Sequence, residues 1–81
     1  MQLSIISTQD QKDLSIDWIE VNTLQGNYVI QSGHAPTVLV LAAGSKVIYN
    51  SINSEQQTEL IIKQGLLHVT RTDCTLLLTQ I

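Results

Sequence analysis

Only three side chains in this sequence are soft ligands for a transition metal, and their spacing does not suit a metal site. They are His34, His68 and Cys74. Zinc sites usually take two ligands from one local turn, separated by roughly two to four residues, and no two of these side chains are that close in sequence. His68 also lies between Leu67 and Val69 in an alternating pattern, which favours a solvent-facing position on a strand. We therefore expect no bound metal.

The ionisable and nucleophilic side chains do not form a catalytic pattern either. An acidic cluster lies between residues 10 and 20, but acid–base catalysis needs a cleft that separates the pKa values of paired carboxylates, and a solvated face is the simpler interpretation. Its members are Asp10, Asp13, Asp17 and Glu20. Ser32 lies near His34 without the glycine-flanked turn of a hydrolase nucleophile. The four glycines are dispersed, so no phosphate-binding loop is expected. The sequence predicts neither an enzyme nor a cofactor site.

The segment Gly33-His34-Ala35-Pro36 is the most informative in the chain and points to binding rather than catalysis. Glycine gives access to backbone angles that other residues avoid, and proline fixes its own φ while favouring an extended conformation at the preceding residue. The tetrapeptide should therefore form an ordered corner that presents an imidazole to a partner. The alternative is an ordinary surface turn with a solvated histidine.

The composition describes one small domain, residues 1–81. Hydrophobic residues make up 43% of the chain with no phenylalanine, so the core must be built from Leu, Ile and Val, which favours β-structure. Charged residues make up only 14% and the net charge is −3, so no basic field is present to bind nucleic acid. Cys74 has no intramolecular partner, which favours a reducing compartment and a small buried hydrophobe. The longest apolar run, residues 38–43, falls far short of the roughly 20 residues of a membrane helix.

Turn signals recur about every 8 to 12 residues, with short apolar runs between them, which is typical of an all-β sandwich or barrel. Residues 14–23 are ambiguous, because Leu14, Trp18 and Val21 would also line one side of a helix, but the density of β-branched residues favours a strand. Gln64-Gly65 suits a tight hairpin turn. The apolar run at residues 74–78 is unbroken, which suggests coverage on both faces, by the domain or by a partner. The expected strands are residues 3–7, 14–23, 28–30, 37–41, 45–50, 58–63, 66–70 and 74–78.

Several sequence elements together resemble one known family. They are Ile19-Glu20-Val21, Gly26-Asn27-Tyr28-Val29-Ile30, Gly33-His34-Ala35-Pro36, Ala43-Gly44, Gln64-Gly65-Leu66-Leu67-His68-Val69 and Cys74-Thr75-Leu76-Leu77-Leu78. These elements cover nearly the whole chain and are similar to the N-terminal domain of the epsilon subunit of bacterial-type rotary ATP synthases. The resemblance implies a β-sandwich of about ten short strands in two sheets. It also implies a subunit domain that is not catalytic and holds no cofactor.

The resemblance implies partners and a mechanical role as well. One side of the sandwich would rest on the gamma subunit, and loops at one end would contact the membrane rotor ring. Such contacts would join ring and stalk into one rotating body for proton-driven ATP synthesis, at the cytoplasmic face of the membrane and attached to it only through the complex. Carried onto this sequence, the ring-facing residues are Gly26, Asn27, Tyr28, His34, Ala35 and Pro36, and the structural turns lie at Gly33, Gly44 and Gly65.

The sequence departs from the family pattern in its turns. Ser32 replaces the proline before the Gly-His corner, Ala43 replaces the proline of a Pro-Gly turn, and Gln64 replaces the first glycine of a pair. The sequence ends at Ile81, where the family commonly continues into a helical hairpin that inhibits ATP hydrolysis, so neither the hairpin nor that regulation is expected here. Because the changes lie in loops, a free-standing β-sandwich adaptor for another protein is the alternative function. A small enzyme is the third interpretation.

Overall fold

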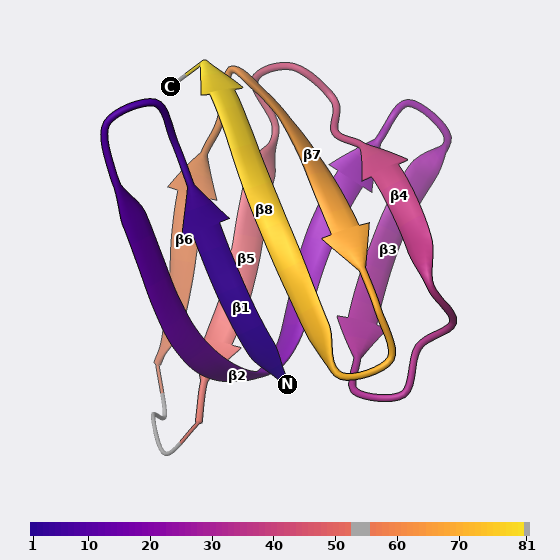
Figure 1. Cartoon of the computed structure of the whole chain (residues 1–81). Coiled ribbons are helices and arrows are strands. Elements are labelled where there is room, and N and C mark those ends of the chain that lie inside the picture. Colours follow the sequence, from indigo (N-terminus) through magenta and orange to yellow (C-terminus); the bar gives the residue numbers. More distant parts are fainter. Residues whose placement is uncertain (53–55, 81) are drawn as a thin grey trace.

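The computed structural model describes residues 1–52 and 56–80, and every regular element in those ranges is a β-strand (Figure 1). The all-β class is confirmed, and residues 14–23 lie within a strand and not a helix. In the same part of the chain, no helix is long and apolar enough to cross a membrane. The strands are β1 (Gln2–Ile6), β2 (Gln11–Thr23), β3 (Gly26–Gln31), β4 (Thr37–Val40), β5 (Lys46–Ser51), β6 (Gln57–Ile61), β7 (Gln64–Val69) and β8 (Asp73–Gln80).

Two sheets face each other, and β2 belongs to both (Figure 1). The front sheet has the order β4-β7-β8-β1 and ends on residues 11–15 of β2. In the back sheet, the second half of β2 pairs with β3 on one side and β5 on the other, and β6 follows β5. A register shift between Ile16 and Trp18 lets β2 bend from one sheet into the other without ending. The described ranges contain eight strands, where the resemblance implies about ten.

The space between the sheets is filled mainly by aliphatic side chains, and no polar or charged residue is buried among those described. Inward and outward residues alternate along the strands, because successive side chains of a strand point to opposite faces. On β8, for example, Cys74 and Leu76 are buried whereas Thr75 and Leu77 are partly exposed. The core consists of Leu3, Ile16, Ile19, Val21, Ile30, Leu41, Val47, Tyr49, Ile62, Leu67, Val69, Cys74 and Leu76.

Two of the predicted turns are placed differently in the structure. Gly65 lies inside β7 and not in a turn, because β6 ends at Ile61 and β7 already begins at Gln64. A Cβ atom at Gly65 would lie 2.9 Å from the backbone oxygen of Leu77, so glycine is needed there for a close approach of two strands beside a register shift. The segment Gly26-Asn27-Tyr28 is likewise not a loop but the beginning of β3.

Candidate partner-binding surfaces

The Gly33-His34-Ala35-Pro36 corner connects β3 to β4 and is held against the neighbouring turn of the front sheet. Gly33 has a φ of 88°, which favours glycine, and its N–H donates to the backbone oxygen of Arg71 at 2.8 Å. The N–H of His34 donates to the oxygen of Gln31 at 3.2 Å. These bonds join the corner to the end of β3 and to the turn between β7 and β8. The corner is therefore ordered by its own backbone contacts.

The imidazole of His34 is half-buried, and its Nδ1 lies 2.7 Å from the backbone oxygen of Ala35. Because a carbonyl oxygen can only accept, Nδ1 is the ring nitrogen that carries a proton in this contact. The Nε2 atom is the other ring nitrogen, which accepts a hydrogen bond in the neutral ring and donates one in the charged ring. Ala35 and Pro36 are exposed beside the ring. The corner thus places a polar ring atom next to a small apolar surface.

The other predicted ring-facing segment lies at the opposite end of β3. Gly26 begins that strand and the corner follows its last residue, Gln31, so roughly 20 Å of extended chain separates them. Asn27 is exposed, and Tyr28 packs at the margin of the core. The structure therefore does not bring the two predicted segments together at one end of the sandwich. A single partner contacts both only if it extends along β3.

An apolar row crosses the outer face of the front sheet, and the sequence analysis did not identify it. Strand pairing places Val40 beside Leu66, Leu66 beside Leu77, and Leu77 beside Ile6. Val40 is 67% exposed, and the other three side chains are partly exposed. The only sequence signal was the unbroken apolar run at residues 74–78, whose outward members need their own cover. This row, Val40-Leu66-Leu77-Ile6, is called the front apolar row below.

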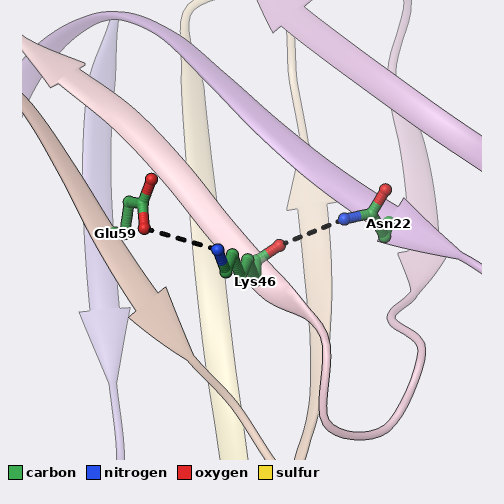
Figure 2. Close-up of polar contacts among 3 residues, drawn as sticks. All are labelled: Asn22, Lys46 and Glu59. Carbon is green, nitrogen blue, oxygen red and sulfur yellow. Dashed lines mark hydrogen bonds and ion pairs between the residues drawn. The ribbon is translucent and has the colours of Figure 1, made fainter.

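The outer face of the back sheet carries linked polar side chains beside exposed apolar ones, since Val29 and Ile61 are 49% and 71% exposed on this face. The side-chain amide of Asn27 donates to Glu20 Oε2 at 3.1 Å and to Asn22 Oδ1 at 2.9 Å. Figure 2 shows how the contacts continue: Asn22 Nδ2 donates to the backbone oxygen of Lys46 at 3.5 Å, and Lys46 Nζ lies 3.7 Å from Glu59 Oε2. Polar side chains from β3, β2, β5 and β6 are therefore linked across this face, where they are paired with one another and solvated.

The side chains considered for chemistry do not converge. In the described ranges no three His, Cys, Asp or Glu side chains lie close enough together to hold a metal ion. Cys74 is buried, and this burial raises the pKa of its thiol to about 11, so the thiol is protonated at neutral pH. His68 is exposed on the front sheet, and the acidic residues are spread over turns and outer faces, where Asp17 accepts from Asn50 at 3.0 Å.

Comparisons with known proteins agree with this architecture. The chain has the fold of a chain in the Tetrahymena thermophila mitochondrial ATP synthase central stalk and c-ring structure, with a TM-score of 0.83, 13% identity, and coverage of 99% of this chain and 63% of that one. A chain of the Euglena gracilis mitochondrial ATP synthase OSCP, F1 and c-ring structure gives a TM-score of 0.80 at 18% identity, with coverage of 96% and 49%. The present chain thus spans less than two thirds of either neighbour.

No curated protein matches the sequence at a significant level. The family model described as the ATP synthase, Delta/Epsilon chain, beta-sandwich domain matches residues 1–81. Because this match covers every residue, the chain belongs to the ATP synthase delta/epsilon chain β-sandwich family.

Proposed function

We propose that this chain joins the gamma subunit of a rotary ATP synthase to the membrane rotor ring, as a non-catalytic part of the central stalk. The observation that carries the proposal is the continuous apolar row on the outer face of the front sheet. A free domain gains little from a row of apolar side chains on an outer face, whereas a subunit that docks by that face buries the row. The chain would then transmit torque by being held between two partners.

The front apolar row is the surface that we assign to gamma. Its four side chains come from adjacent strands and form one continuous stripe. The row beside it runs Val38-His68-Thr75-Ser4-Asp13, with its one carboxylate at the β2 margin of the sheet. On the back face charges interrupt the apolar side chains, since the paired row there reads Val29-Glu20-Ile48-Glu59, and desolvation of its carboxylates would oppose docking. We therefore expect the gamma subunit to bind the outer face of the front sheet, and the outer face of the back sheet to stay in contact with water.

The ring contact is assigned to the margin of β3 and the corner that follows it. Asn27 and His34 lie near the two ends of this margin, so polar loops of the ring would have to run along β3 to contact both. The Nε2 atom of His34 and the exposed Ala35 and Pro36 suit such a contact. In this proposal the rotor ring contacts the side of the sandwich formed by β3, and not one end of the sandwich as the resemblance implies.

The test is binding to the gamma subunit of the same source, measured by size-exclusion chromatography with mass detection and by isothermal titration calorimetry. Leu77→Lys places a charge in the front apolar row, and we expect gamma to bind about a hundredfold more weakly because the ammonium must be desolvated in the interface. Ile48→Lys is the matched control, since Ile48 is a partly exposed residue of a central strand on the outer back face, between Glu20 and Glu59. This variant should bind gamma as the wild type does.

The ring contact is tested separately with the assembled complex. His34→Ala removes the imidazole at the corner but leaves the front sheet unchanged, so we expect gamma binding to be retained and attachment of the stalk to the ring to weaken. A folded chain that fails to bind gamma would contradict the stalk role. That outcome would favour a β-sandwich adaptor with another protein partner.

A further inference from the structure

We propose that the partner covering the front apolar row also adds an extended, uncharged β-strand to the open edge of β4. The inference rests on the proposed function, because it specifies how that partner is held. Among the described residues β3, β4 and β6 each pair with a strand on one side only. Open edges of this kind bind other strands unless charges, prolines or bulges protect them. The three edges differ in this protection.

Two of the edges carry polar or charged residues. β6 contains Glu59, which is paired with Lys46 across the back face, and β3 carries Asn27 with its amide bonded to Glu20 and Asn22. β4 has the sequence Thr-Val-Leu-Val, with no charge and no proline inside the strand. Its residues Val38 and Val40 are 57% and 67% exposed. β3 and β4 both lack charge and proline inside the strand, but β4 is the edge that borders the front apolar row and presents two exposed valines.

The backbone geometry of β4 leaves hydrogen-bonding groups directed to the open side. The N–H of Leu41 donates to the oxygen of Gly65 on β7 at 3.0 Å. Because bonding to one neighbour alternates along an antiparallel strand, Leu39 also bonds to β7, whereas the backbone groups of Val38 and Val40 point away from it. Only an extended chain matches backbone donors and acceptors at this spacing.

The side chains around this edge specify an apolar occupant. A cavity of about 290 Å³ lies beside β4, between it and the turn that joins β2 to β3. Leu24, in that turn, is 93% exposed, and it lines the cavity together with Val38 and Val40. No charged side chain lines the cavity, which comprises Thr23, Leu24, Gln25, Val38, Leu39 and Val40. An apolar side chain of the added strand would fill it.

The length and position of the added strand are also limited. Leu41 forms a bridge to Thr23, and Ala42 donates to the oxygen of Asn22 at 2.9 Å, so the edge is closed directly after Val40. The front apolar row begins at Val40. A partner strand along residues 37–40 would therefore continue that row beyond β4, and the same partner would cover both. A four-residue edge is too short to hold a second copy of this chain on its own.

The first test is amide hydrogen exchange of the labelled chain, read residue by residue by NMR, free and in complex with its gamma subunit. The N–H groups of Val38 and Val40 should exchange rapidly in the free chain and become protected at least tenfold in the complex. The N–H of Leu39 faces β7 and should be slow in both states, which makes it the internal control.

The second test is a pair of proline substitutions at matched edge positions. Val38→Pro removes an outward N–H without removing a bond to β7, and we expect gamma to bind about tenfold more weakly. Ile61→Pro does the same on β6, since Ile62 donates inward to the oxygen of Ser45 at 3.0 Å and the groups of Ile61 face outward. This control should bind gamma normally. Unchanged circular dichroism spectra would show that both variants fold.

The outcomes separate the two proposals. A complex that forms without protection of Val38 and Val40 overturns the added strand and leaves the stalk role standing. Absence of any complex overturns both. If the free chain forms dimers that Val38→Pro abolishes, a second copy is the occupant of the edge, and the assignment to the partner is wrong.

Discussion

The two outer faces of this sandwich are built on similar backbones, but apolar side chains are continuous on one face and interrupted by charges on the other. The front sheet presents the apolar row Val40-Leu66-Leu77-Ile6, whereas the back sheet presents paired polar side chains such as Lys46 and Glu59. The shared core lies between the sheets and does not depend on either outer face. Because side chains alternate along each strand, the residues that form the core and the residues that we propose for docking are different residues of the same strands.

Neighbouring residues on β8 test this separation most strongly. Leu76 is fully buried between the sheets, and Leu77 faces outward in the front apolar row. Leu76→Ala should lower the free energy of unfolding by about 3 kcal/mol, because it leaves a cavity in a packed core. Leu77→Ala should lower it by less than about 1 kcal/mol, because its side chain is already partly solvated. Urea unfolding at fixed pH measures both.

Equal losses for the two variants would contradict the assigned orientation of β8. Binding to gamma provides the reverse comparison, since Leu77→Ala should weaken the complex whereas Leu76→Ala, where it is folded, should not. Leu76→Ala would then lower stability without weakening binding, and Leu77→Ala would weaken binding with little loss of stability.

Features that depend on residues close together in the sequence could be predicted, whereas features that depend on contacts between distant strands could not. The all-β class follows from local turn signals and β-branched runs. The unbroken run at residues 74–78 predicts cover on both faces of β8, and the structure shows the inner cover, where Cys74 and Leu76 are buried. The front apolar row could not be predicted, because it depends on the register of four strands that are distant in sequence. Register is set by tertiary packing.

Gly65 and Asn27 show the same limit for single residues. A glycine in a sequence can mark either a turn or a place where two backbones come close together. At Gly65 the nearby backbone is that of Leu77 on another strand, which the local sequence does not reveal. Asn27 and His34 are close in sequence, and the resemblance placed both at one end of the sandwich. The extended strand between them carries them apart. The family motif predicts which residues contact a partner, but it did not predict their arrangement along β3.

Cys74 is buried on the same face of β8 as Leu76. The pH dependence of the free energy of unfolding therefore gives a second test of the orientation of β8. Burial raises the pKa of the Cys74 thiol from 9.0 to about 11. Below pH 9 the thiol keeps its proton in both the folded and the unfolded chain, so it contributes no pH dependence to the free energy of unfolding there. Between pH 9 and 11 unfolding releases the proton, and the free energy of unfolding should fall by about 2–3 kcal/mol through this group.

The measurement compares unfolding curves of the wild type and Cys74→Ala across this pH range. Lysine and tyrosine titrate in both proteins, so the difference between the curves isolates the thiol. A one-residue slip of β8 would turn Cys74 outward and Thr75 inward, and the two curves would then run parallel. Convergence of the curves as pH rises would support the buried thiol.

The smallest effect is expected on the back face, from the ion pair between Lys46 and Glu59. Both side chains are more than half exposed, and Nζ and Oε2 are 3.7 Å apart. Lys46→Gln should therefore change the free energy of unfolding by less than about 0.5 kcal/mol, and the change should shrink further in high salt, because exposed pairs are screened. Urea unfolding at low and high ionic strength measures it. A loss of several kcal/mol that persists in salt would mean that the polar network holds the back sheet together. The small effect expected here is consistent with the proposed function, in which the charges keep the back face solvated and the front face is the one that docks.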